Sequence, residues 1–334
     1  MNSFGRLFRV SIYGESHGNS VGVLIDGCPA GLFLAEKDFE TDLRRRRSGA
    51  KGTTPRIEFD IPHFMSGIFN NTTTGAPINI QFENINTRSV DYLELRDLPR
   101  PGHADFVATH KFGGFEDYRG SGHFSGRLTL GLVTAGVIAK RLLGEIHISA
   151  KLVEVGGMTD VESAVDRAIE ENESIGGIVE CRVSKVPVGL GEPFFDSVES
   201  LISHIIFSIP AIKAIEFGSG FQAARMKGSE HNDNIINMDG TTETNNAGGI
   251  NGGLSNGNDI VFRVAVKPAS STSQPQNTLN IKTEEIEELV VEGRHDKCIA
   301  LRVPPVVEGA VAIVLADLMM MEGKIKRIYL QEDE

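Results

Sequence analysis

Two histidines occupy short turns in which glycine or proline restricts the path of the chain. His17 lies in GESHG at positions 14–18, and His103 lies in PRPGHADF at positions 99–106, beside Arg100. A histidine held in such a turn can act as a general acid or base, because its side chain titrates near neutral pH. A single histidine is more often structural than catalytic, so both are candidates that need support from other residues.

A run of four arginines, RRRR at positions 44–47, ends a predicted helix over residues 35–47. Successive helical positions lie about 100° apart, so the four side chains cannot all face solvent if the helix packs through Phe39 and Leu43. The planar guanidinium pairs well with carboxylate and phosphate groups. With Lys51 and Arg56 close by, the run is either a solvated helix end or a clamp for a small polyanion.

The segment GSGHFSGRLTLG at 120–131 places glycines, a hydroxyl and an arginine before a predicted helix. Ser125 or a neighbour is expected to cap this helix, whose free N–H groups can bind an anion. Arg127 in the first turn is unfavourable for the helix dipole. An unfavourable residue at this position favours, weakly, a ligand at the turn.

Three further segments are either ligand contacts or ordinary polar loops: NNAGGINGGLSNG at 245–257, KPASSTSQPQ at 267–276 and GRHDKC at 293–298. Glycine permits close backbone approach, and lysine, serine and arginine can hold a phosphate. None of the segments matches GxGxxG after a strand or GxxxxGK followed by Ser or Thr, so neither nucleotide fingerprint applies. We find no HExxH or similar spacing, and we expect no metal site.

Strand and helix patterns alternate without an obvious linker, which predicts an α+β or α/β fold and favours one compact domain. Strands are predicted at 5–13, 21–26, 151–157, 177–185, 212–217 and 259–266, with short strands and loops over 56–98. Helices are predicted at 35–47, 125–143, 160–173, 197–207 and 306–321. Small residues keep one face of the 125–143 helix flat, so we expect it to pack closely on another element. The Gly- and Asn-rich segment 228–258 has no core pattern, and loops of that length are usually functional or disordered.

The composition restricts the class of protein. The 334 residues carry a formal net charge of −12, which argues against a general nucleic-acid binder. Three cysteines lie far apart, as is typical of a reducing compartment. No signal peptide is evident, and the segment taken as the most apolar, 128–143, is too short to span a bilayer. We therefore predict a cytoplasmic protein without a membrane partner.

Taken together, these segments resemble one family, the chorismate synthases. The motifs GESHGNSVGVLIDGCP, RRRSG, RPGHAD, GHFSGRLT, NNAGG, KPASS, GRHDKC and VVEG follow in the family's order over nearly the whole chain. The resemblance implies an α+β fold, a β-α-β sandwich forming a single domain over 1–334, and assembly as a homotetramer. It also implies a lyase of the shikimate pathway, which removes phosphate and a ring proton from 5-enolpyruvylshikimate 3-phosphate by anti-1,4-elimination. The product is chorismate, and reduced FMN is required although nothing is oxidised overall.

The resemblance implies roles for individual residues. His17 and His103 would be catalytic, one protonating the reduced flavin and the other assisting the departing phosphate, and Asp296 would help the flavin accept the ring proton. The flavin contacts would be His123, Phe124, Ser125, Asn246, Ala247, Gly252, Lys267, Pro268, Ala269, Ser270, Ser271 and Arg294. The substrate contacts would be Ser16, Arg46, Arg47, Lys51, Arg100 and Arg127.

The chain departs from the family's pattern at three places. The turn after the arginine run is one residue shorter, with Lys51 where arginine is common. His123-Phe124-Ser125-Gly126-Arg127 stands where Arg-Ser-Ser-Ala-Arg is usual, and Lys297 stands where proline is usual. The chain also lacks a nicotinamide fingerprint. We therefore expect no intrinsic NADPH-driven flavin reductase activity and an external flavin reductase as the source of reduced FMN.

Two other functions would use the same residues. A phosphate-handling enzyme without flavin, such as a phosphotransferase, would use the arginine cluster but would need a metal or a nucleotide loop. A nucleic-acid-binding protein could use RRRR with the glycine-rich loops. The net charge of −12 and the lack of aromatic clusters count against it.

Overall fold

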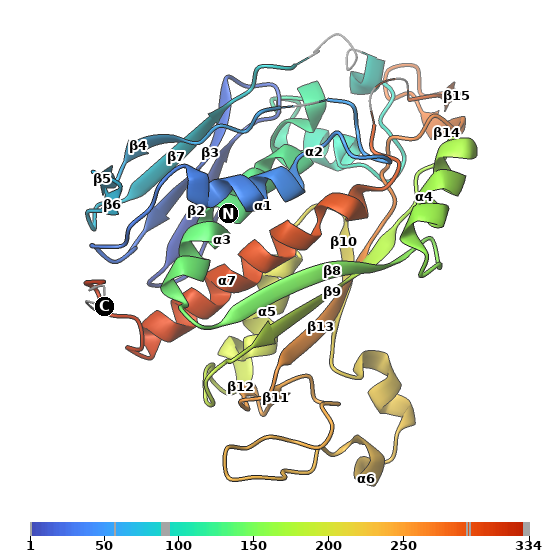
Figure 1. Cartoon of the computed structure of the whole chain (residues 1–334). Helices are drawn as coiled ribbons and strands as arrows, with labels where there is room; N and C mark the ends of the chain where they lie inside the picture. The colour runs from blue at the N-terminus through green and yellow to red at the C-terminus, as the bar shows by residue number, and fades with distance from the viewer. Residues whose placement is uncertain (1, 57, 88–93, 292, 294, 330–334) are drawn as a thin grey trace.

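The computed structural model describes residues 2–56, 58–87, 94–291, 293 and 295–329. Two antiparallel sheets enclose a layer of helices, which confirms the predicted α+β sandwich (Figure 1). The first sheet has the strand order β1 (Ser3–Phe4), β2 (Arg9–Gly14), β3 (Ser20–Asp26), β7 (Ile78–Glu83) and β4 (His63–Ser66). The second has the order β10 (Ile212–Phe217), β13 (Ile260–Val266), β9 (Gly177–Ser184) and β8 (His147–Val155).

The helices α3 (Thr129–Leu142) and α7 (Pro304–Met321) form the centre of the sandwich. α3 packs on β3, α7 packs on β8 and β9, and the two helices pack on each other. Their contact is close because both carry glycine at the crossing: a Cβ added to Gly136 would lie 2.2 Å from the Cα atom of Gly309. The expected close packing of the small-residue helix is therefore confirmed.

Helix α7, and not the segment 128–143, is the most apolar long stretch. Its mean hydropathy of 1.6 over 18 residues would suit a membrane span, but 83% of this helix is buried inside the protein. The apolar side chains of α7 are those of a core helix, because they pack between α3, α5 (Val198–Ile206) and the second sheet.

The remaining elements lie at the edges of the sandwich. α1 (Lys37–Arg46) packs on α3 and α7, and α4 (Val161–Glu170) packs on β8. The smaller elements are α2 (Asp105–Phe112), α6 (Gly228–His231), β5 (Ile68–Phe69), β6 (Thr72–Thr73), β11 (Ile250–Asn251), β12 (Leu254–Ser255), β14 (Gln276–Leu279) and β15 (Ile286–Leu289). The segment 218–258 forms an arm that extends from the end of β10 and returns to β13, away from the helical layer (Figure 1).

Most predicted elements are confirmed within a few residues, but the strand predicted over 5–13 is confirmed only from Arg9, where β2 begins. Residues 5–8 form a turn between β1 and β2, because the backbone N–H groups of Arg6, Leu7 and Phe8 donate to the Asp317 carboxylate of α7 at 2.7–3.0 Å. The strand predicted from 151 begins at His147, and α2 and the β14–β15 hairpin were not expected.

Candidate active site

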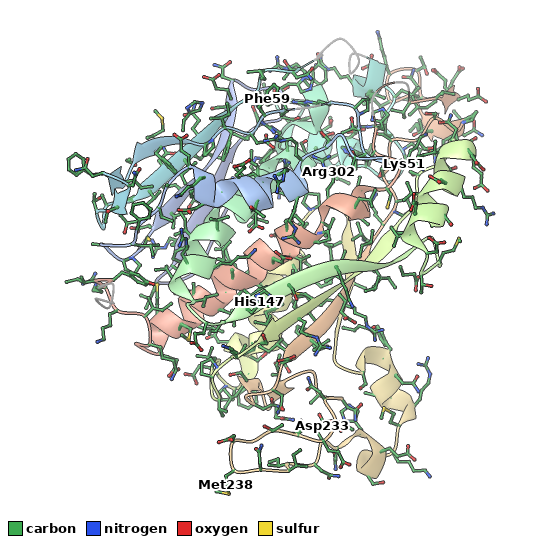
Figure 2. All side chains as sticks on the ribbon, viewed as in Figure 1. Lys51, Phe59, His147, Asp233, Met238 and Arg302 are labelled. Atoms are coloured by element: carbon green, nitrogen blue, oxygen red, sulfur yellow. The ribbon has the colours of Figure 1, made fainter. Side chains whose placement is uncertain are left out.

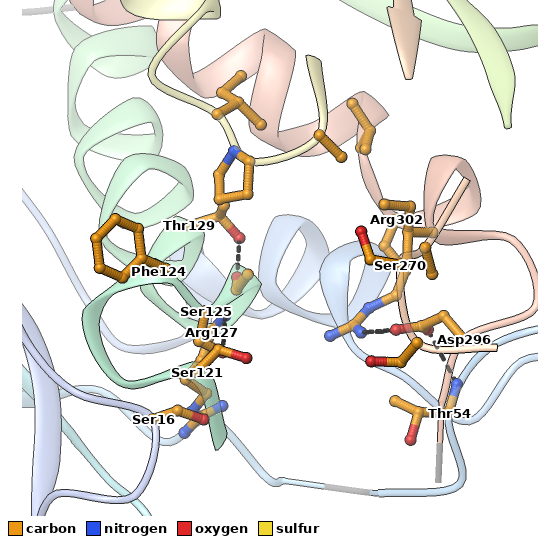
Figure 3. A pocket seen from close by; sticks show the side chains of 18 of the residues that line it. Ser16, Thr54, Ser121, Phe124, Ser125, Arg127, Thr129, Ser270, Asp296 and Arg302 are labelled. Carbon is orange, nitrogen blue, oxygen red and sulfur yellow. Dashed lines mark hydrogen bonds and ion pairs between the residues drawn. The ribbon is translucent and has the colours of Figure 1, made fainter. Parts of the chain in front are cut away.

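A cavity of about 740 Å³ lies where several loops meet beside the N-terminus of α7 (Figure 3). Its walls come from the end of α1, the loop 54–60, the turns 100–104 and 120–127, the connection 207–213, the loop 267–271 and residues 295–306. Segments far apart in sequence therefore meet at one place. Among the residues that the structure describes, eight arginine and lysine side chains and three carboxylates line this cavity: Arg46, Arg47, Arg56, Arg100, Arg127, Lys213, Lys267 and Arg302, with Glu58, Asp60 and Asp296.

The GESHG turn is held from two sides. The Asn84 amide donates to the carbonyl oxygens of Glu15 and Gly18 at 2.9 Å each, and the Ser16 N–H donates to the Gly122 carbonyl oxygen at 3.0 Å. The buried His17 ring packs directly on Gly120, where an added Cβ would lie 2.3 Å from the His17 Cδ2 atom. Ser16 and Gly120 line the cavity, so His17 lies directly behind its wall.

His103 lies in the cavity wall with its orientation fixed. Its Nδ1 atom lies 2.6 Å from the Asp105 Oδ1 atom, and its Nε2 atom lies 3.2 Å from the Ser121 hydroxyl. Because the carboxylate can only accept, the Nδ1–H donates to it, and Nε2 is the nitrogen that can exchange a proton. Burial would raise the pKa of Asp105, but hydrogen bonds from Arg100 and His103 outweigh burial and hold this pKa below its usual range.

Arg100 connects three of the loops. Its guanidinium binds both carboxylate oxygens of Asp105 at 2.7 Å and donates to the hydroxyls of Ser271 and Ser121 at 3.0 and 3.1 Å. Most of its donors are therefore occupied by the protein. Its positive charge still faces the cavity, but its contacts mainly hold the three loops in place.

Two buried arginines share one carboxylate. Arg46 contacts Asp60 at 3.4 Å, and Arg127 also binds Asp60; both arginines donate further to neutral oxygens. Burial lowers the pKa of Arg46 to about 9, Asp60 raises it, and the positive charges of Arg302 and Arg127 lower it further. The guanidinium stays charged at neutral pH, and its lowered pKa reflects mainly burial.

On the other side of the cavity, the Asp296 carboxylate lies between the Arg302 guanidinium and the Thr54 backbone N–H (Figure 3). The Thr54 N–H donates to Asp296 at 2.9 Å, and the Arg302 guanidinium lies 3.2 Å from the same carboxylate. Arg47 lines the cavity nearby, and its buried Nε atom has no hydrogen-bond partner among the described residues. An unpartnered guanidinium donor in a cavity wall is a contact for an anionic ligand.

The predicted flavin residues fall into two places. His123, Phe124, Ser125 and the loop 267–271 line the cavity, and the Ser125 hydroxyl accepts from the Arg127 N–H at 3.2 Å, as expected for a cap. Asn246 and Ala247 instead lie in the arm, where both backbone N–H groups donate to Asp233. Figure 2 shows Asp233 at the far end of the molecule from Arg302. Gly252 lies in the β11–β12 turn outside the cavity lining, and Arg294 lies outside the described residues.

Lys51 is also placed apart from the cavity. Its side chain is 59% exposed and forms an ion pair with Asp166 of α4. The other residues expected to hold the substrate, namely Ser16, Arg46, Arg47, Arg100 and Arg127, line the cavity.

Several lining residues were not singled out from the sequence. Asp60 and Arg302 were missed because they belong to no motif, and the connection 207–213 was missed because its apolar residues resemble an ordinary turn. The Asp60 backbone has φ of +49°, a value that a sequence pattern does not reveal for a non-glycine residue. The isolated arginine before the prolines of α7 was the one available signal for Arg302.

Comparison with known proteins identifies the family. The family model for chorismate synthase matches residues 8–320. This chain belongs to the chorismate synthase family. A chorismate synthase from Chitinophaga pinensis is 65% identical over 330 residues, covering 98% of this chain and 99% of that protein. One from Dehalococcoides mccartyi is 46% identical, covering 99% of this chain and all of that protein. A solved crystal structure of chorismate synthase superposes with a TM-score of 0.74 at 26% identity, covering 96% of this chain and 93% of the other.

The cavity fits the ligands that the family resemblance implies. Its volume of about 740 Å³ lies within the usual range of ligand pockets. Its lining also includes the apolar side chains of Ile209, Pro210, Ala211, Ile299, Val303 and Val306, which suit the flat ring of FMN. The cations and the unpartnered Arg47 Nε atom suit phosphate and carboxylate groups. The residues present therefore fit FMN together with a small phosphorylated acid.

Proposed function

We propose that this chorismate synthase family member, a lyase of the shikimate pathway, converts 5-enolpyruvylshikimate 3-phosphate into chorismate and inorganic phosphate in the presence of reduced FMN. The ring C–O bond to phosphate breaks and its electron pair leaves with the phosphate. The electron pair of a ring C–H bond enters the new diene as the proton departs, so no net oxidation occurs. The observation that carries the proposal is the excess of cations over carboxylates in one cavity that also holds His103 and Asp296.

Binding of the trianionic substrate is the task of the arginines. Arg46 and Arg127 are held in place by Asp60, whereas Arg47 has an unused donor. Charge develops on the phosphate oxygen as the C–O bond breaks. Fixed guanidinium groups stabilise that charge without reorganising at the moment of reaction.

We assign the phosphate side to His103. Its Nε2 atom can hold a proton for the departing phosphate, because Asp105 fixes the ring through Nδ1. We assign the cofactor side to His17 and Asp296, which would hold protons next to the flavin ring. Bound reduced FMN supplies electron density that assists cleavage of the allylic C–O bond. The flavin contacts proposed in this chain are His123, Phe124, Ser125, Lys267, Pro268, Ala269, Ser270 and Ser271, with Arg294 outside the described residues.

We further propose that residues 1–334 act as one domain and assemble as a cytoplasmic homotetramer. The support for association between copies is the arm, which exposes large apolar side chains: Phe221 is 75% exposed, Ile235 72% and Met238 fully exposed. In such an assembly, Asn246, Ala247 and Gly252 would contribute to the cavity of a neighbouring copy. Reduced FMN would come from an external flavin reductase.

Anaerobic turnover tests the proposed reaction. Purified enzyme is mixed with 5-enolpyruvylshikimate 3-phosphate, with and without photoreduced FMN, and both chorismate and phosphate are quantified. We expect equal amounts of the two products, and only with reduced FMN. Phosphate released without FMN and without chorismate would instead support a phosphate-handling enzyme that does not use flavin.

A further inference from the structure

Two lysines meet at the paired ends of β10 and β13. Ile212 lies opposite Val266, and the Lys267 N–H donates to the Ala211 carbonyl oxygen at 2.9 Å. The register shifts between Ile212 and Ala214, so Lys213 lies at a bulge in β10. Lys213 and Lys267 both line the cavity. The resemblance assigns Lys267 to the flavin, but it assigns no role to Lys213.

The charges of these two lysines are not balanced by the protein. In the described part of the chain, neither lysine forms an ion pair with a carboxylate. The Lys267 ammonium donates to neutral oxygens only, those of Ser270 at 2.6 Å, Gly102 at 3.2 Å and Pro268 at 3.4 Å. Burial lowers the pKa of Lys267, and the positive charge of Lys213 lowers it further.

Other cations of the cavity differ in this respect. Arg100 is paired with Asp105, Arg127 with Asp60, and Arg302 with Asp296. Lys213 is exposed and Lys267 is partly buried, so water screens part of their repulsion, and both charges remain available to an anion that binds between them. The Ser270 hydroxyl, 2.6 Å from the Lys267 ammonium, adds a hydrogen-bonding group for such an anion.

We propose that Lys213 and Lys267 together form a subsite for a phosphate monoester, with Lys213 as an additional binding residue. The subsite rests on the proposed function, because both ligands of the reaction carry such a group. The phosphate belongs either to the FMN side chain or to the substrate, and the two sources give different results when Lys213 is changed.

The experiment measures binding without turnover. The dissociation constants of oxidised FMN and of riboflavin, which lacks the phosphate, are measured by flavin fluorescence with wild type, Lys213→Gln and Lys213→Arg. The chain contains no tryptophan, so protein fluorescence interferes little. The affinity for 5-enolpyruvylshikimate 3-phosphate is measured by calorimetry. Lys185→Gln is the matched control, because Lys185 is exposed and paired with Glu145 outside the cavity.

We expect Lys213→Gln to weaken the binding of one phosphorylated ligand by about tenfold, the loss expected for one charge-assisted hydrogen bond. Lys213→Arg should restore most of that affinity, and Lys185→Gln should change nothing. A loss for FMN but not for riboflavin supports the subsite and assigns it to the flavin phosphate. A loss for the substrate alone supports the subsite and assigns it to the substrate phosphate.

Unchanged affinity for both phosphorylated ligands, or an equal loss for FMN and riboflavin, would overturn the subsite. These results would leave the proposed reaction intact, since chorismate formation is measured separately. Failure of chorismate formation by the wild-type protein would contradict the proposed function, whereas a loss of affinity for one phosphorylated ligand in Lys213→Gln would still support the subsite. Circular dichroism of each variant checks that the fold is retained.

Discussion

The cations of the cavity form two groups that differ in how their charge is balanced. The inner group, Arg46 and Arg127, is buried and shares the Asp60 carboxylate. The outer group, Arg47, Lys213 and Lys267, has no carboxylate partner among the described residues. The inner group is therefore part of the folded architecture and sets the shape of the cavity. The outer group gains a negatively charged partner only when an anionic ligand binds. Stability should therefore depend on the inner group and ligand binding on the outer group.

The largest expected effect comes from removing the carboxylate of the inner group. Asp60→Ala leaves two buried guanidinium groups without a counter-charge, which should lower the free energy of unfolding by about 3–5 kcal/mol. Chemical denaturation measures the loss. Asp60→Gly serves as a control, because it removes the same carboxylate but relieves the positive φ of +49°. If Asp60→Ala were as stable as wild type, the inner group would not be architectural.

The next largest effect concerns the two histidines proposed to hold protons, His103 in the cavity lining and His17 behind it. His17→Ala and His103→Ala should retain the fold and reduce turnover by about 10²-fold or more, the contribution typical of general acid–base catalysis. Anaerobic steady-state kinetics with excess reduced FMN measures the effect. Exposed His147 on β8 provides the control variant His147→Ala, with unchanged turnover. Rates close to wild type in both cavity variants would remove the histidine assignment.

The stabilisation that Asp105 provides should depend on pH. Its pKa is held below the usual range, so its ionised form stabilises the fold above about pH 4, and this stabilisation is lost as pH falls toward the folded-state pKa. Asp105→Asn should therefore cost about 1.5–3 kcal/mol near neutral pH, the usual worth of hydrogen bonds to a charged group. The difference from wild type should shrink below about pH 4. Urea unfolding at pH 7 and pH 3 measures both values, and a difference that is the same at both pH values would contradict the prediction.

The outer group should show the opposite pattern from Asp60. Arg47→Gln should leave the free energy of unfolding within about 0.5 kcal/mol, because no carboxylate loses a partner. The value of kcat/KM should fall by about tenfold or more, because a charge-assisted contact to the substrate is lost. Denaturation and steady-state kinetics on the same preparation test the contrast. A variant that loses stability but keeps kcat/KM would place Arg47 in the inner group.

The smallest effect is expected at Lys51, which the family resemblance assigns to the substrate. Its exposed ion pair with Asp166 lies outside the cavity, so Lys51→Ala should change stability by less than about 1 kcal/mol. We also expect kcat/KM to stay within about twofold of the wild-type value, which is below the worth of one charge-assisted contact. A tenfold loss would show that Lys51 reaches the substrate when the ligand is bound.

The sequence allowed the prediction of the sandwich from its alternating and helical patterns, and of much of the cavity wall from its short motifs. Alternating and helical patterns located β3, β9, β13, α1, α3 and α7, and the motifs located His103, Ser125 and the 267–271 loop. The split of the first strand could not be predicted, because Asp317 binds its amides from α7, more than 300 residues away. Asp60 and Lys213 were missed for a similar reason: their roles depend on side chains that only the tertiary fold brings near.

The most direct test of the account is the structure of this enzyme with oxidised FMN and 5-enolpyruvylshikimate 3-phosphate bound. We predict that both ligands lie in the one cavity, with the Arg47 Nε atom donating to an anionic group of the substrate and the flavin ring on the wall formed by 209–211. A structure in which the two ligands occupy separate sites, or in which Arg47 and His103 contact neither ligand, would contradict the account.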